Sequence, residues 1–320
     1  PIRETLKKLV LEHKIILIDE IQNFPEATLA LKVLHDEFGI KIIATGSSEL
    51  RQKSKDFDSL AGRYKEIFCL PFSSEEIILN TKIEEYKKTD FYQKITNEFQ
   101  TFGAYPEIYL SKLSERERIN LLRQLFEAYV LKDIINIYNL KNTKLAVDIL
   151  TKIALQLGSE VSLREIATSL SANVTTVGSY IEIFIKNYIL IPLPSFKTNL
   201  RRVVSENRKL YFYDLGLRNI LVRDFRPLEL RPDRGGLFEN FVLLEMEKRR
   251  KIYNLPYNFY FYREYGGREI DIIIEDYKKN YTCLEIKLSK GYGKKIFPLP
   301  HRIETIDKDS YFPKIKSILK

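Results

Sequence analysis

Two short apolar segments near the start of the chain constrain its fold most strongly. Ile15-Ile16-Leu17-Ile18 ends in Asp19-Glu20, and Lys41-Ile42-Ile43-Ala44 is followed by the tetrapeptide Thr-Gly-Ser-Ser. Neither segment alternates apolar with polar residues, which favours strands that are buried on both faces of a parallel sheet. With helices expected near 2–12 and 26–37, the first 80 residues predict a helix-covered α/β unit.

In the remainder of the chain, the expected secondary structure changes several times. Aromatic and aliphatic residues first recur at helical spacing, three short helices and two strands follow, and the last part again alternates a helix with strands. A Pro- and Arg-rich stretch at 223–236 is expected to be a linker. The 320 residues therefore predict an α/β chain with four regions, which are 1–80, 81–145, 146–225 and 226–320.

The composition indicates which kinds of binding partner and which cellular compartment to expect for this protein. The chain has 52 Lys and Arg against 43 Asp and Glu, a net charge of +9, which favours an anionic partner such as nucleic acid. Its two cysteines, Cys69 and Cys283, stand far apart, which excludes a disulfide scaffold or a cysteine zinc site and fits the reducing cytoplasm. No apolar run is long enough for a membrane span, so we expect no membrane partner.

Four ordered motifs resemble part of a known ATPase family. The motifs IILIDEIQ, IIATGSS, LAGR and LPFSSEEI, in this order between residues 15 and 77, are similar to the Walker B strand, sensor strand, arginine-bearing turn and closing strand of a group of prokaryotic AAA+ ATPases. Members of this group carry a C-terminal domain of unknown function. The family implies a homo-oligomer that forms through the AAA+ domain.

The resemblance also implies roles for individual residues. Asp19 would hold Mg²⁺ and Glu20 would activate the attacking water. Ser47 or Ser48 would sense the γ-phosphate. Arg63 would be an arginine finger, with a simple ion pair to Glu66 as the alternative.

One motif of that family is missing from the sequence. The family's GxxxxGK[ST] phosphate loop should precede the Walker B strand, but only 14 residues stand before Ile15 and none forms this loop. Because the loop's backbone amides and lysine hold the β- and γ-phosphates, we expect no ATP binding by the chain as given. ATP becomes a cofactor only if an upstream segment supplies the loop; the first residue, Pro1, suggests a longer reading frame or lost residues.

Residues 162–190 predict a helix-turn-helix. Ser162 and Asn173 can cap two short helices, and apolar residues recur on one face of each. A following hairpin with a basic loop completes the pattern of a winged helix, whose wing grips DNA phosphates. The alternative is a protein-interaction module with a solvated loop. The candidate DNA contacts are Thr175, Thr176 and Ser179 on the second helix, and Lys197, Arg201, Arg202, Arg208 and Lys209 in the hairpin.

The last region places acids and a lysine on one helix and two strands. Glu239 stands on the helix, Asp271 on one strand, and Glu285-x-Lys287 on the next. Two carboxylates and a lysine on adjacent strands suit hydrolytic Mg²⁺ chemistry. The pattern resembles the PD-(D/E)XK restriction-endonuclease-like fold. That resemblance implies metal ligands at Glu239, Asp271 and Glu285, with Lys287 completing the catalytic set.

The sequence therefore leaves three hypotheses. The first is an AAA+-type protein that acts on DNA through a winged helix and a Mg²⁺-dependent nuclease-like domain. The second is a non-catalytic DNA-binding or regulatory protein. The third is an ATP-driven switch that remodels proteins.

Overall fold

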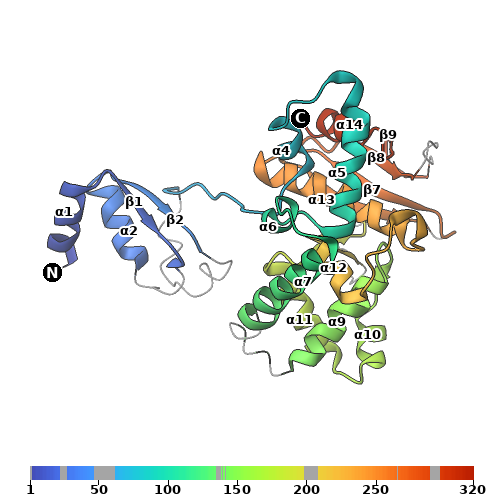
Figure 1. Ribbon diagram of the computed structural model, residues 1–320, viewed down its shortest axis with the longest axis horizontal. Helices are drawn as coiled ribbons and strands as arrows, with labels where there is room; N and C mark the ends of the chain where they lie inside the picture. Colours follow the sequence, from blue (N-terminus) through green and yellow to red (C-terminus); the bar gives the residue numbers. More distant parts are fainter. Residues whose placement is uncertain are drawn as a thin grey trace. The chain divides into compact units, whose positions relative to one another are not determined.

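The chain folds into two compact units, 1–67 and 68–320. The computed structural model describes residues 2–21, 27–46, 62–134, 138, 140, 142–197, 208–264, 266–288 and 296–320 (Figure 1). It contains both a parallel sheet pair and antiparallel sheets among helices, so the predicted α/β class is confirmed.

The N-terminal unit contains the expected parallel strands. Its elements in chain order are α1 (Ile2–Glu12), β1 (Ile15–Ile18), α2 (Ala27–Asp36) and β2 (Lys41–Ala44). The strands pair in parallel from Ile15↔Lys41 to Ile18↔Ala44. Burial alternates along β1, because Ile18 packs with the small core around Ile21 and Leu31. Leu17, in contrast, remains 74% exposed, so the described part of this sheet is not buried on both faces as predicted.

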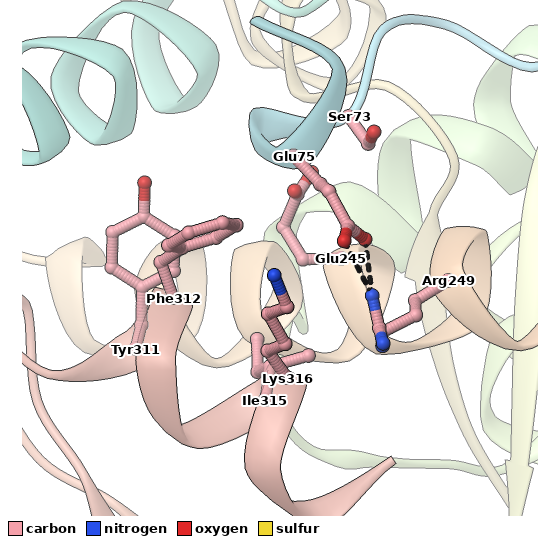
Figure 2. A pocket seen from close by; sticks show the side chains of 8 residues that line it. All are labelled: Ser73, Glu75, Glu245, Arg249, Tyr311, Phe312, Ile315 and Lys316. Atoms are coloured by element: carbon pink, nitrogen blue, oxygen red, sulfur yellow. Dashed lines mark hydrogen bonds and ion pairs between the residues drawn. The ribbon is translucent and has the colours of Figure 1, made fainter. Parts of the chain in front are cut away.

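The second unit begins with a segment that packs on the long helix α13 (Arg234–Ile252). Helix α4 (Ser74–Leu79) starts at a capping box formed by Ser73 and Glu76. The backbone amide of Ser74 donates to the buried Glu245 carboxylate at 2.6 Å. Glu75 faces the Arg249 guanidinium at 2.6 Å, as Figure 2 shows. Residues 68–80 therefore fold with the second unit, whereas the sequence analysis placed them in the first.

Helices occupy much of the region 81–145, where the sequence predicts helical spacing. Their buried side chains, among them Ile95, Phe99 and Leu122, join the cores of the second unit. The elements are the 3-10 helix η3 (Glu85–Lys87), α5 (Lys88–Phe102), α6 (Pro106–Tyr109), α7 (Glu115–Leu125) and the π-helix η4 (Phe126–Ile134).

A helix–strand module follows, which we define as residues 142–213. It comprises α9 (Thr143–Leu155), β3 (Glu160–Val161), α10 (Leu163–Ser169), α11 (Val174–Lys186), β4 (Leu190–Pro194) and β5 (Arg208–Phe212). The three strands form an antiparallel sheet in the order β3-β5-β4. Side chains of Asn142, Ser162 and Asn173 cap the helices by accepting backbone amide hydrogen bonds.

The stretch predicted to be a linker is packed and not free. Helix α12 (Leu215–Val222) and the 3-10 helix η6 (Leu228–Leu230) precede α13 (Arg234–Ile252). Between them Arg231 is fully buried; its guanidinium reaches Asp233 at 2.8 Å and the Asp224 carbonyl oxygen at 2.7 Å. Arg218 bonds the same Asp233 and the Ala154 carbonyl oxygen. A buried arginine needs such partners, so this network fixes the helix–strand module against α13.

The C-terminal sheet lies beside α13 (Figure 1). Its strands β6 (Asn258–Arg263), β7 (Glu269–Glu275), β8 (Tyr281–Ile286) and β9 (His301–Ile306) occur in that order in the sheet, and α14 (Tyr311–Ile318) follows. The pairs β6–β7 and β7–β8 are antiparallel, and β8–β9 is parallel. Ile272, Ile274 and Leu284 pack with Phe241 of α13 in the largest core. This packing brings the acidic residue of the helix to those of the strands.

Candidate functional site

At the end of the parallel strands, Thr45 joins the two acids that follow β1. Its hydroxyl donates a hydrogen bond to the Asp19 carboxylate and accepts one from the Glu20 backbone amide at 3.1 Å. Glu20 has a φ of +52°, a left-handed conformation that this bond helps to hold. The sequence analysis proposed Ser47 and Ser48 from the same segment, and both lie outside the described residues. It missed Thr45, although its position directly after the strand was a usable signal.

Arg63 pairs with an acid that the sequence analysis did not consider. Its guanidinium Nε lies 2.9 Å from Asp36 Oδ1. The hydrogen bond from Arg63, helped by His35, lowers the pKa of Asp36 to about 2. Asp36 ends α2, which returns from the end of β1 to the start of β2, so it lies at the sheet edge opposite Asp19. Arg63 is thus not beside Asp19 within its own unit.

Glu239 is held by two side chains of the helix–strand module. The Asn240 side chain bonds both the amide and the carbonyl of Phe212, which fastens α13 along β5. The neighbouring Glu239 then accepts hydrogen bonds on Oε1 from Tyr211 and, at 3.0 Å, from Lys209 Nζ. Lys209 and Tyr211 are two residues apart on a strand and therefore share a face.

Lys209 also bonds an acid of the C-terminal sheet. Its ammonium pairs with Glu269 at the start of β7. Glu269 in turn accepts from Arg263 Nε at 2.8 Å, and Arg263 also reaches Glu160 of β3 at 2.8 Å. Burial alone would lower the pKa of Lys209, but attraction to Glu239 and Glu269 outweighs it and raises the pKa. Lys209 is therefore a charged lysine inside the protein.

Asp271 lies where the regular pairing of β7 ends. A register irregularity separates the pairs Tyr260↔Ile273 and Tyr262↔Ile270, and leaves the segment with Asp271 out of step with β6. The Asp271 carboxylate accepts a hydrogen bond from the backbone amide of Ile286 at 2.7 Å. This bond places Asp271 directly beside the end of β8.

Ile286 lies in the sequence between Glu285 and Lys287, the other two predicted site residues of this segment. Glu285 is only 1% exposed, and its Oε2 lies 2.9 Å from Lys287 Nζ. This side-chain bond raises the pKa of Lys287, with contributions from the Asp271 and Glu239 charges. The structure thus brings Glu239, Asp271, Glu285 and Lys287 together; below we call these four residues the acidic site.

The charges of the acidic site are unevenly matched. Glu239 pairs with Lys209 and Glu285 pairs with Lys287, whereas Asp271 accepts its hydrogen bond from a backbone amide. Burial raises the pKa of Asp271 to about 7, and the Glu239 and Glu285 charges add to the effect. The surroundings of Asp271 therefore oppose ionisation of its carboxyl group.

These carboxylates suit a hard divalent cation, although no ion-binding cage is preformed. In the described parts of the chain, no three carboxylate, imidazole or thiol side chains are already arranged to hold a metal. The chemistry nevertheless fits Mg²⁺, which prefers carboxylate oxygen. The buried Oε1 of Glu285 has no hydrogen-bond partner among the described residues, and such an oxygen is costly unless an ion or water satisfies it. Asp271 and Glu285 would hold the ion.

The candidate DNA contacts differ in exposure. Thr175 and Ser179 are exposed on α11, and Thr176 is partly buried. Lys197 is partly buried, and Arg201 and Arg202 lie outside the described residues. Arg208 belongs to β5 and pairs with Glu182 at 2.7 Å.

Lys209 requires a correction. It was predicted to contact DNA from the basic loop of the hairpin, but it lies in β5 and its side chain is 1% exposed. It therefore does not present its charge to DNA from the wing. The sequence analysis also missed Tyr211, Glu269 and Arg263, although Glu269 and Asp271 already stood two positions apart on one predicted strand.

Family models match three parts of the chain. Residues 2–78 match an AAA domain, 93–229 match a domain of unknown function (DUF8612), and 234–304 match a second one (DUF4143). The AAA match and the C-terminal match support an AAA-type, ATPase-like protein. None of the helices that the structure describes is long and apolar enough to cross a membrane.

Two curated proteins are similar to this chain at low sequence identity. An uncharacterized protein of Haemophilus influenzae is 22% identical over 238 residues, covering 73% of this chain and 57% of the relative. The uncharacterized protein MJ1637 of Methanocaldococcus jannaschii is 24% identical over 317 residues, covering 92% of this chain and 65% of the relative. The chain thus spans less than two thirds of either relative. No solved structure matches it.

Proposed function

We propose that this protein joins an AAA-type, ATPase-like domain to a divalent-cation-dependent site that hydrolyses phosphodiester bonds in DNA. The observation that carries the proposal is the position of Asp271, whose carboxylate is bonded to the amide between Glu285 and Lys287. Two acids and a lysine at adjacent strand ends are the parts that such hydrolysis needs. The proposal takes the C-terminal α/β region as a PD-(D/E)XK-like domain.

Each residue of the acidic site has a distinct role in this proposal. Asp271 and Glu285 would hold the cation directly, and Glu239, which Lys209 and Tyr211 already bind, would reach it through water. When bound, Mg²⁺ supplies Lewis-acid stabilisation and lowers the pKa of a coordinated water. The Lys287 ammonium, which is 35% exposed, faces the solvent edge of the site and stabilises negative charge that develops on the phosphate.

DNA contact is assigned to the helix–strand module. Its helices and its three-stranded sheet follow the element order of a winged helix. Thr175 and Ser179 are exposed near the start of α11, the helix that would face the groove. Lys197, Arg201 and Arg202 in the hairpin would contact phosphates, while Lys209 is committed to the acidic site.

Nucleotide contact is assigned to the carboxyl edge of the parallel strands. Asp19 would hold Mg²⁺ and Glu20 would orient the attacking water of ATP, together with a phosphate loop. Thr45, bonded to both acids, would fix their positions. This assignment applies to the protein as a homo-oligomer of AAA-type domains, in which Arg63 would act on a neighbouring copy.

A second candidate function is binding of DNA without cleavage. Two observations favour it: Lys209 and Lys287 already neutralise two of the three acids, and no ion cage is preformed among the described residues. In this case the site stabilises the domain and the helix–strand module alone contacts DNA.

A cleavage assay separates the two candidates. The purified chain is incubated with labelled duplex DNA and Mg²⁺ or Mn²⁺, with Asp271→Asn as the test variant and Glu229→Gln, an exposed acid outside the site, as the control. The proposal expects ion-dependent cleavage by the wild type and the control, and none by Asp271→Asn. DNA binding without cleavage by all three proteins would favour the second candidate.

A further inference from the structure

The most deeply buried cation near the acidic site comes from another part of the fold. Lys209 belongs to β5 of the helix–strand module, but its ammonium lies between Glu239 of α13 and Glu269 of β7. It also lies 5.5 Å from the centre of the Phe261 ring. A lysine in such surroundings loses its hydration, so it persists only where anions replace the lost water.

Lys209 and its neighbours determine which way Glu239 points. Both Lys209 and Tyr211 donate to the same oxygen, Oε1. Burial, together with the charge of Glu239, raises the pKa of Tyr211, which keeps this phenol protonated as a donor. The other oxygen, Oε2, faces Gly158, where an added Cβ would stand only 3.3 Å away. Glu239 is therefore enclosed on the side of the helix–strand module.

We infer that Lys209 is a resident internal cation that withholds Glu239 from a divalent ion and thereby sets the acidic site to two available carboxylates, Asp271 and Glu285. This inference rests on the proposed function, because it concerns the ion of the same site. Lys209 is a positioning residue: it acts through Glu239. The helix–strand module thus positions one residue of the acidic site, in addition to its proposed contact with DNA.

The inference predicts that removal of Lys209 creates a third ligand. If the ammonium is lost, Glu239 lacks its buried cation, and its negative charge already interacts with that of Asp271. A bound ion would then gain a carboxylate. Because a simple loss of Lys209 also makes the site more negative, the test must separate a freed ligand from a changed net charge.

A paired substitution makes this separation. Lys209→Met with Glu269→Gln removes one positive and one negative charge, so the net charge is unchanged while Glu239 is released. Arg263→Met with Glu269→Gln changes the same charges but leaves Lys209 on Glu239, which makes it a matched control. Affinity for Mn²⁺ alone is measured by calorimetry on the full chain at pH 8. Circular dichroism checks that each protein is folded.

The expected result is an increase in Mn²⁺ affinity of roughly 10-fold for the Lys209→Met/Glu269→Gln protein, the scale typical of ligand-shell changes. Adding Glu239→Gln should return the affinity to the wild-type value or below, and the Arg263 control should match the wild type. If the Lys209 pair does not fold, Lys209→Leu with Glu269→Leu provides the same comparison with apolar side chains, which often replace a buried ion pair without loss of stability.

Two outcomes would overturn the inference. One is an affinity in the Lys209 pair no greater than in the wild type, including no Mn²⁺ binding by either. The other is a gain that survives Glu239→Gln. The proposed function is tested separately by Asp271→Asn. If this variant keeps the Mn²⁺ affinity of the wild type, the proposed ion site is wrong. A gain of Mn²⁺ affinity in the Lys209→Met/Glu269→Gln protein that depends on Glu239 would still support the role of Lys209.

Discussion

The carboxylate of Asp271 accepts a hydrogen bond from the backbone amide of Ile286 at 2.7 Å. This bond ties an acid of one strand to the next strand, between Glu285 and Lys287. A side chain held by backbone pairing moves little when a ligand arrives, so the acid and the lysine keep one relative position. The same bond leaves the remaining Asp271 oxygen atom for other partners.

Replacement of Lys287 by Met should slow metal-dependent cleavage without loss of ion binding. The ammonium is 2.9 Å from Glu285 and is the partly exposed cation of the acidic site. Loss of a group that stabilises transition-state charge commonly lowers kcat by about 10²–10³-fold. Mn²⁺ affinity should be unchanged or higher, because Glu285 loses a competing cation. Single-turnover cleavage and calorimetry measure the two effects.

Lys279→Met is the matched control for Lys287→Met. Lys279 is 69% exposed and pairs at 2.8 Å with a buried acid, Glu275, at the other end of β7. It therefore repeats the pairing of an exposed lysine with a buried glutamate away from the acidic site. Equal loss of cleavage in both variants would mean that Lys287 acts only through the stability of the sheet.

Arg201→Ala with Arg202→Ala should weaken duplex binding and flatten its salt dependence. Each lysine or arginine that neutralises a DNA phosphate contributes about 0.9 to the slope of log K against log salt. The double variant should therefore lower the magnitude of the slope by up to ~2. Arg226→Ala is the control, because Arg226 is exposed and pairs with Asp224 at 2.8 Å outside this module. An unchanged slope would show that the hairpin does not contact phosphates.

The sequence predicted the local elements better than the contacts between them. The parallel pairing of residues 15–18 with 41–44 followed from two apolar segments, and the α/β class from the alternation of helices and strands. The meeting of Asp271 with the Glu285-x-Lys287 segment followed from two strands joined by a short turn. In each case the signal lies within a few neighbouring residues.

Ion pairs between residues far apart in the chain could not be predicted from the sequence in the same way. Lys209, Arg218 and Arg231 look like solvated cations in the sequence, because most lysines and arginines are. Their burial depends on acids that other elements bring to them, such as Glu239 for Lys209 and Asp233 for both arginines. The boundary at residue 67 depends likewise on the contact of Ser74 with Glu245, 171 positions later.

Gly103→Ala should destabilise the second unit strongly. Gly103 has a φ of +80° at the end of α5, which disfavours any side chain, and an added methyl group would overlap the Asp214 carboxylate. We expect a loss of about 3 kcal/mol or more in the free energy of unfolding, from backbone strain plus displacement of Asp214. Gly267→Ala is the control, since it shares the φ of +80° but would meet nothing within 4 Å. Similar losses of unfolding free energy in both variants would show that the contact with Asp214 does not contribute to the effect of Gly103→Ala.

Asp214 should make the stability of the second unit decrease as pH rises through about 6. The buried carboxylate accepts hydrogen bonds from the Ala104 amide at 2.7 Å and the Leu217 amide at 3.0 Å. Burial nevertheless outweighs these bonds and raises its pKa from 3.8 to about 6. Between these values the folded state binds more protons than the unfolded state, so protonation favours folding. The advantage is complete below about pH 4 and is lost above about pH 6.

The contribution of Asp214 is measured as a difference from Asp214→Asn in urea unfolding at pH 4.5 and 7. Asn does not titrate, and its amide group donates where one carboxylate oxygen accepted, so this variant should be less stable than the wild type. The stability difference between the two proteins should shrink from pH 4.5 to 7, by on the order of 2 kcal/mol. All other titrating groups are common to both proteins and cancel. A difference that stays constant, or grows with pH, would show that Asp214 is ionised in the folded state throughout this range.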